Sequence, residues 1–243
     1  MAGAPASRGI KAFAALSLAL AAGSVDIIGY VSFGQLFTAH LTGDTVHLGQ
    51  NLFDARWEQA AKAGAIILAF FAGSIIGRAM IEVASRLRVR SVATATLLLE
   101  AVLIGAVAVS GGSRFYFVFL LAVAMGVQTA TLTRVGSLTV HTTFVTGMIN
   151  KLAQLVSHVS FLTYDAVRGS GGAKRVRVAR LREARFIFGV WFCYLAGAAL
   201  GSAVHERWDV RALLLPVVVV LLLTALDQAW PLSVEEEHDQ SER

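Results

Sequence analysis

Charged residues are scarce in this chain. Only 15% of its 243 residues are Asp, Glu, Lys or Arg, whereas 56% are hydrophobic. In soluble domains roughly a quarter of the residues are charged, because a charged surface has to cover the buried core. The composition therefore excludes an ordinary soluble domain. It favours an all-α integral membrane protein whose surroundings are the lipid bilayer.

Cysteine pairs and catalytic motifs are missing as well. The single cysteine, Cys193, lies inside an apolar run, which excludes a disulfide framework and a cysteine zinc site. The chain contains no HExxH, GxSxG, P-loop or GxGxxG motif. Asp44 and His47 have the spacing of two metal ligands on one helix face, but no third ligand accompanies them. We therefore expect neither an enzyme nor a bound cofactor or metal.

Basic residues outnumber acidic ones, which gives a net charge of +5. They lie in short segments between apolar runs, without interleaved aromatic residues, so they indicate membrane topology rather than a nucleic-acid interface. Two basic groups, in residues 78–90 and 174–185, are expected on the cytoplasmic side together with the basic N-terminal segment. This distribution predicts a multi-pass membrane protein with both termini in the cytoplasm.

Six apolar stretches are long enough to cross a bilayer as helices. A hydrocarbon layer of about 30 Å requires roughly twenty helical residues, because only a helix satisfies its own backbone hydrogen bonds there. Two further segments, 42–55 and 144–165, have a helical pattern with more polar residues, and we expect them to lie at an interface or to dip into the membrane. The six predicted spans are residues 12–35, 60–82, 91–110, 115–134, 186–206 and 211–230.

Two stretches are strongly hydrophilic. Residues 168–185 open with a glycine-rich run and are predicted to form a flexible loop. The acidic tail, residues 232–243, is predicted to be disordered. Neither stretch marks a domain boundary, so residues 1–243 are expected to form a single transmembrane domain.

The sequence contains an internal repeat. Thr42-Gly43 recurs as Thr146-Gly147, and the segment Ala72–Gly77 recurs as Ala196–Gly201 in the same order. At the offset of 104 residues that relates Thr42 to Thr146, Gln50 matches Gln154, and His40 falls near His141. Three spans in each half is an odd number, so the second half is expected to be inserted upside down, as in the inverted repeats of many secondary transporters. The predicted halves are residues 10–112 and 113–231.

One pattern resembles a known family. Ala22-Gly23-Ser24-Val25-Asp26, followed by Phe37–Asp44, is similar to the YoaK-like family of bacterial integral membrane proteins, a domain of unknown function. The resemblance extends over nearly the whole chain and implies about six spans and a bacterial inner membrane. Members commonly have Asn after the first Thr-Gly, where this chain has Asp44. The family implies no catalytic or binding residues.

Two acidic residues fall inside predicted spans, where a charged carboxylate is costly. Asp26 is interpreted either as a proton or cation site, or as a cap of a first helix broken near Gly23 and Gly29. Glu100, close to the middle of its span, either couples transport to an ion or a proton, or forms a neutral hydrogen bond that locks packing. Both alternatives stay open for each residue.

Polar residues recur at helical spacing in the two Thr-Gly segments. Such a stripe suits a water-lined cavity, and it equally suits an interfacial helix with its polar side in the lipid headgroups. A threonine-rich run from Thr129 to Thr146 offers hydroxyls for a substrate, or hydroxyls that return to their own helix backbone. The stripes consist of Asp44, His47, Gln50 or Asn51, and Asp54 in the first half and Asn150, Gln154 and His158 in the second.

These features favour a secondary transporter or permease for a small solute or ion. The alternative is a non-transporting membrane scaffold, or an assembly or stress-associated protein that binds another membrane protein. The substrate, the coupling ion and the oligomeric state are left open. The predicted pathway is lined by Asp26, His40, Thr42, Asp44, His47, Gln50, Glu100, Gln128, Thr146, Asn150, Gln154 and His158.

Overall fold

The structure is a computed structural model, and it contains helices and one short hairpin. The acidic tail, apart from Leu232, lies outside the described residues, as do the glycine-rich start of the predicted loop and His141. The residues that the structure describes are 6–87, 89, 91–110, 115–131, 134–135, 138–139, 142–167 and 173–232.

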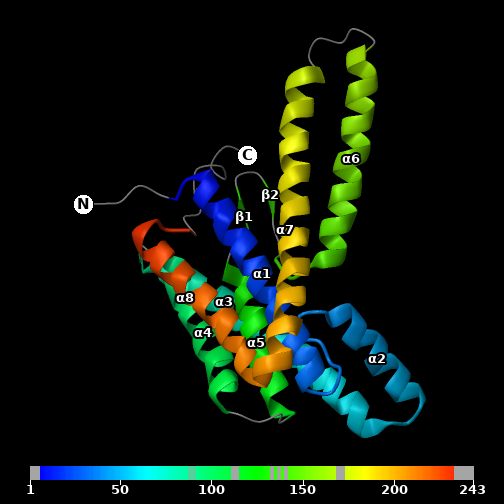
Figure 1. Ribbon diagram of the computed structural model, residues 1–243, viewed down its shortest axis with the longest axis vertical. Helices are drawn as coiled ribbons and strands as arrows, with labels where there is room; N and C mark the ends of the chain where they lie inside the picture. The colour runs from blue at the N-terminus through cyan, green and yellow to red at the C-terminus, as the bar shows by residue number, and fades with distance from the viewer. Residues whose placement is uncertain are drawn as a thin grey trace.

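The α-helices are grouped in chain order into two series of four (Figure 1). The first series consists of α1 (Arg8–Ser32), α2 (Leu41–Phe53), α3 (Trp57–Arg86) and α4 (Val92–Ser110). The second consists of α5 (Tyr116–Thr131), α6 (Val145–Val167), α7 (Ala173–Trp208) and α8 (Leu214–Ala229). The antiparallel pair β1 (Arg134–Val135) and β2 (Leu138–Thr139) follows α5, and the 3₁₀ helix η1 (Asp209–Leu213) joins α7 to α8.

Four stretches of the described residues are long and apolar enough to cross a membrane. They are Arg8–Ser32, Trp57–Arg86, Val92–Ser110 and Val176–Ala229, the last of which contains most of α7, η1 and α8. Helix α5 is apolar but shorter. The predicted helical class is confirmed, and every predicted span overlaps one of these helices.

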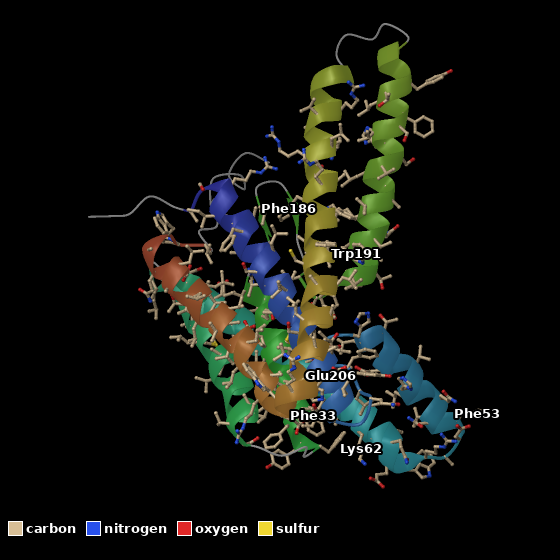
Figure 2. All side chains as sticks on the ribbon, in the orientation of Figure 1. Phe33, Phe53, Lys62, Phe186, Trp191 and Glu206 are labelled. Atoms are coloured by element: carbon tan, nitrogen blue, oxygen red, sulfur yellow. The ribbon has the colours of Figure 1, made fainter. Side chains whose placement is uncertain are left out.

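Large apolar side chains remain exposed on the outer faces of these helices. On α3 the exposed residues include Leu68 and Phe71, and on α8 they include Leu222. Phe53, at the outer end of α2, is 91% exposed (Figure 2). Apolar surface of this extent suits contact with lipid, because soluble monomers rarely expose contiguous apolar patches of this kind. The buried core forms two clusters. One surrounds Leu18 of α1 and Leu97 of α4 and includes residues of α6, α7 and α8, and the other surrounds Leu121 of α5 and includes residues of α1, α3 and α4.

The structure corrects one alternative and one prediction about local structure. Helix α1 runs without interruption from Arg8 to Ser32, so the alternative in which Asp26 caps a helix broken near Gly23 and Gly29 does not hold. The predicted flexible loop is helical from Ala173 onwards, because that segment is rich in Ala, Arg and Lys, which favour helix even where charge keeps them out of a membrane. The basic residues therefore extend α7 instead of interrupting the chain.

Glycines allow two pairs of helices to approach until their backbones touch. In the pair α1–α7, a Cβ atom added to Gly23 would overlap the carbonyl oxygen of Tyr194, and one added to Gly197 would overlap the carbonyl oxygen of Leu20. Small residues at such a crossing are typical of membrane helix packing. Gly197, which belongs to the repeated segment Ala196–Gly201, therefore lets α1 and α7 pack backbone against backbone.

The pair α3–α5 crosses in the same manner. A Cβ atom added to Gly73 would overlap the carbonyl oxygen of Val123, and one added to Gly126 would overlap the carbonyl oxygen of Phe70. Gly126 follows Gly23 by 103 residues, and Gly197 follows Gly73 by 124 residues. Each crossing therefore joins the first helix of one series to the third helix of the other.

Candidate functional site

Asp26 is the most highly connected polar side chain near the α1–α7 crossing. It lies on α1, three residues after Gly23, and is 3% exposed. Its Oδ1 atom accepts hydrogen bonds from the backbone N–H of Thr38 at 2.7 Å, from the Thr38 hydroxyl at 2.8 Å and from the backbone N–H of Ala39 at 3.0 Å. Asp26 therefore fixes the segment that leads from α1 into α2.

The other carboxylate oxygen of Asp26 contacts α7, a helix of the second series. The Tyr194 hydroxyl donates to Oδ2 at 2.5 Å, and Nδ1 of His40 lies 3.4 Å from the same atom. These partners match a carboxylate, which only accepts hydrogen bonds when it is ionised. A single side chain thus joins α1, the start of α2 and α7.

His40 immediately precedes α2 and is partly exposed, with 35% of its side chain accessible. Its hydrogen bond with Asp26 raises the pKa of the imidazole above 6.5, against an opposing effect of burial. The ring also lies against Phe37 and Tyr194, with centroid distances of 5.1 and 6.4 Å. A proton on His40 is therefore stabilised by a buried carboxylate.

Asp44 lies in the first turn of α2 and is fully buried. Its Oδ1 atom accepts a hydrogen bond from the backbone N–H of Phe37 at 3.2 Å, whereas Oδ2 has no hydrogen-bond partner among the described residues. Burial raises the pKa of this carboxyl to about 6. Asp44 therefore changes its charge close to neutral pH.

A cavity of about 340 Å³ lies between the start of α2 and the start of α6. Both Thr-Gly segments contribute to it, so the structure brings together Thr42 and Thr146, which lie far apart in the sequence. Its walls are mainly apolar, with hydroxyl groups and the imidazole of His40 as the polar groups. The lining residues are Ala39, His40, Leu41, Thr42, Phe70, Thr129, Thr143, Phe144, Val145 and Thr146.

Gln128 fixes the start of α6 in much the same way as Asp26 fixes the start of α2. Its Nε2 atom donates to the carbonyl oxygen of Leu18 at 2.8 Å and to the hydroxyl of Thr142 at 3.3 Å. One residue further along α5, the hydroxyls of Thr129 and Thr143 lie 3.0 Å apart. Gln128 is buried but does not line the cavity.

Several predicted pathway residues lie elsewhere. His47 lines a second cavity of about 270 Å³ beside α3, on the same helix as the cavity-lining Thr42. The polar stripe of α6 is exposed and does not line either of these two cavities. The exposed residues that belong to the predicted stripes are His47, Gln50, Asp54, Asn150, Gln154 and His158.

Glu100 is fully buried on α4, and neither of its carboxylate oxygens has a hydrogen-bond partner among the described residues. It does not line the cavity between α2 and α6. A further buried acid, Asp227 on α8, is a residue that sequence reasoning missed. It accepts hydrogen bonds from the Thr94 hydroxyl at 2.7 Å and from the backbone N–H of Leu232 at 2.8 Å, so it ties the end of α8 to α4.

Thr38 and Tyr194 are site residues that sequence reasoning missed. A signal for Thr38 was present, because the repeat extends from Thr42 back to it: Thr38–Gly43 matches Thr142–Gly147 at a constant offset of 104 residues. Tyr194 lies just before the repeated segment Ala196–Gly201, but its partner Asp26 is 168 residues away. Such a distant contact leaves no local pattern.

The structure describes no group of three or more His, Cys, Asp or Glu side chains that could hold a metal ion. Membrane-length apolar helices around a buried polar site define the class of protein as a helical integral membrane protein. The chain belongs to the family described as Protein of unknown function (DUF1275), whose model matches residues 14–226.

A curated relative agrees with this assignment. The chain is 30% identical over 145 residues to the UPF0700 transmembrane protein YoaK of Bacillus subtilis (strain 168). The match covers 58% of this chain and 64% of the relative, which is less than two thirds of the relative's length. No solved structure matches the chain. The resemblance drawn from the sequence motifs is therefore confirmed.

Proposed function

We propose that the chain is a secondary transporter or permease for a small solute or ion in the bacterial inner membrane. The observation that carries this proposal is the cavity in which the matching segments at the starts of α2 and α6 meet, next to a buried carboxylate. Membrane transporters commonly bind their substrates where two structural repeats meet. The proposal includes no catalytic step, no cofactor and no nucleic-acid partner.

An inverted repeat supports this function. In the proposed topology, α1, α3, α4, α5, the second part of α7 and α8 cross the membrane, with both termini in the cytoplasm. Helices α2 and α6 point toward opposite ends of the molecule (Figure 1). The two glycine crossings have corresponding partners, as a two-fold relation between the halves requires. Two halves of opposite orientation give the cavity one gate toward each side of the membrane.

The chemistry of the cavity favours a small solute. A volume of about 340 Å³ is at the lower end of the range for ligand pockets. Aromatic side chains, Phe70 and Phe144, supply apolar walls, while His40 and the threonine hydroxyls supply a few polar contacts. A solute with a short apolar part and one polar or charged group matches such a lining.

Reconstitution in liposomes tests the proposal. Proteoliposomes on a solid-supported membrane would be exposed to concentration jumps of inorganic ions, organic acids, amino acids and sugars, and transient currents or radiolabel uptake would be measured. We expect a response to at least one class, and we expect Thr146→Trp, which fills the cavity, to abolish it. Gln154→Trp, on the exposed face of the same helix, is the matched control and retains the response.

Two outcomes would contradict transport through this cavity. One is equal activity in the Thr146→Trp and Gln154→Trp proteins. The other is the lack of any solute response in well-folded protein, combined with co-purification of one membrane protein in a fixed ratio. The second outcome would favour the alternative function, a membrane scaffold or assembly partner.

A further inference from the structure

The correspondence between the two glycine crossings assigns a counterpart to the residues around Asp26. Along α1 and α5 the offset of 103 residues pairs Asp26 with Thr129. Along α3 and α7 the offset of 124 residues pairs Phe70 with Tyr194. Phe70 and Thr129 both line the cavity. The acid and its tyrosine donor thus correspond to a hydroxyl and a phenylalanine.

The starts of α2 and α6 show the same difference: ionisable residues in the first segment correspond to neutral residues in the second. The offset of 104 residues pairs His40 with Phe144 and Asp44 with Met148. We call Asp26, His40, Asp44 and Tyr194 the ionisable side; of these residues His40 lines the cavity, and the other three lie behind it. Its counterpart, Thr129, Phe144, Met148 and Phe70, is the neutral side.

The backbone arrangement is similar on both sides even though the chemistry differs. Asp26 accepts from the backbone N–H of Ala39 at 3.0 Å, and Thr129 at the corresponding position lies 3.0 Å from the hydroxyl of Thr143, the counterpart of Ala39. A hydrogen bond therefore holds the start of each helix. Only one of these hydrogen bonds involves a group that can carry charge.

We propose that the ionisable side binds the proton that is coupled to solute movement, with His40 as the acceptor and Asp44 as a second acceptor beside it. This proposal rests on the transporter function proposed above. It makes the proton the coupling ion, and it assigns one coupling site to each chain.

His40 has the geometry of a proton acceptor. Its Nδ1 atom is engaged with Asp26, so in the neutral ring Nδ1–H donates to the carboxylate and the lone pair of Nε2 is available. A hydronium ion in the cavity transfers its proton to Nε2, so one O–H bond breaks, one N–H bond forms and water is released, and the imidazolium keeps its contact with Asp26. The partial exposure of the ring in the cavity wall gives the proton a route to it.

Asp26 is a positioning residue rather than the acceptor. Thr38 and Ala39 donate to one of its oxygens, and Tyr194 and His40 face the other. A proton on either oxygen would have to displace one of these donors. Asp26 therefore keeps its negative charge and holds a protonated His40 in place.

Asp44 adds a second place for a proton. Its Oδ2 atom is buried without a hydrogen-bond partner among the described residues, so an ionised carboxylate there is poorly compensated. Among the described residues, the titratable groups that face His40 are Asp26 from α1, Asp44 from α2 and Tyr194 from α7. The described residues of α5 and of the start of α6 that line the cavity are neutral.

Proton binding can be measured without a known solute. We would record ¹⁵N-histidine NMR spectra of the protein in lipid nanodiscs across the range where imidazole titrates, and assign His40 by its loss in His40→Gln. We expect its midpoint above the ordinary histidine value, and we expect Asp44→Asn to lower that midpoint. His47→Gln, on the exposed face of α2, is the matched control and leaves the His40 midpoint unchanged.

A proton count gives a second readout. Between alkaline and acidic buffer, His40→Gln should take up about one proton fewer than the wild type, as should Asp44→Asn, with folding checked by size exclusion. The NMR midpoint, which is assigned to His40, rather than the count attributes the proton to this ring. A His40 ring that does not titrate, or a midpoint unaffected by Asp44→Asn, would overturn the proton site.

Transport measurements separate this proposal from the proposed function. In proteoliposomes that contain a pH-sensitive dye, the active solute should move protons in the wild type, and His40→Gln should lose that movement. Solute movement that does not depend on pH and persists in His40→Gln would overturn the coupling while the transporter stands. A titrating His40 in a protein without any solute response would overturn the proposed function and restrict this cluster to proton binding.

Discussion

The two glycine crossings, α1–α7 and α3–α5, are built alike, whereas the side chains next to them differ in chemistry. Gly23 and Gly197 touch the backbone of the partner helix in one crossing, as Gly126 and Gly73 do in the other. Beside the first crossing lies a buried carboxylate, and at the corresponding place beside the second lies Thr129. The backbone packing is therefore repeated at both crossings, while the side chains at the corresponding places beside them are ionisable at one crossing and neutral at the other.

The largest expected effect is a loss of stability when a side chain is added at either glycine crossing. Gly73→Val and Gly197→Val each place a side chain where the partner backbone lies, so we expect each to destabilise the fold by roughly 3 kcal/mol. The yield of monodisperse protein and its melting temperature would measure this loss. Gly49→Val is the control, because an added Cβ there meets no described atom within 4 Å. Well-folded Gly73→Val and Gly197→Val proteins would show that the crossings are not needed.

The next largest effect is a difference in stability between variants of the ionisable side and variants of the neutral side. Asp26→Leu removes the acceptor of three hydrogen bonds from Thr38 and Ala39, and leaving buried donors unpaired costs about 1–3 kcal/mol each. Thr129→Val removes the contact with Thr143, so the expected cost is about 1 kcal/mol. Thermal unfolding in one detergent would compare the two variants. Equal losses would contradict a special role for the ionisable side.

Asp44 predicts how stability depends on pH. Its pKa in the folded protein, about 6, is above the ordinary value of 3.8, so folding favours the protonated form and stability falls as pH rises through this range. The raised pKa of His40 acts in the same direction, because its contribution is present below pH 6.5 and lost as pH rises through the folded-state pKa.

We therefore expect the wild type to melt at a higher temperature at pH 5 than at pH 8. Asp44→Asn should reduce this difference by raising stability at pH 8 by about 1–3 kcal/mol, because the amide carries no charge into the buried site. Melting curves of both proteins at the two pH values provide the measurement, and a wild type that is more stable at pH 8 would contradict the assignment.

The smallest perturbation tests the orientation of the two halves. Single cysteines at Gln50, Ser85 and Gln154, which are exposed positions, would be introduced into Cys193→Ala protein. In intact cells we expect a membrane-impermeant maleimide to label Gln50→Cys only, and to label Ser85→Cys and Gln154→Cys after permeabilisation. Labelling of Gln154→Cys from outside would break the inverted relation between the halves.

Much of the fold could be predicted from apolar run lengths and charge placement, because both follow from the thickness of a bilayer. All six predicted spans overlap helices of the structure, and α2 and α6 begin within one residue of the predicted segments. Helix α7 was underestimated, because apolar length marks the part of a helix that suits a membrane and says nothing about a charged extension.

The site was predictable only where a local pattern existed. The cost of a buried carboxylate singled out Asp26, and the repeat singled out Thr42 and Thr146, which the structure brings to one cavity. Helical spacing shows which residues share a face, but it does not show where that face points. The stripe that contains Asn150 and Gln154 is exposed for this reason.

The glycine crossing of α1 and α7 lies close to Tyr194 and far from the start of α7, which determines how far each would move if α7 tilted around Gly197. Tyr194, which binds Asp26, lies only three residues from Gly197, whereas the start of α7 lies 24 residues away. A tilt of about 10° around Gly197 would displace the start of α7 by roughly 6 Å and Tyr194 by less than about 1 Å, at 1.5 Å per helical residue. A tilt of this kind would therefore move the start of α7 by several ångströms while the hydrogen bond between Tyr194 and Asp26 is preserved.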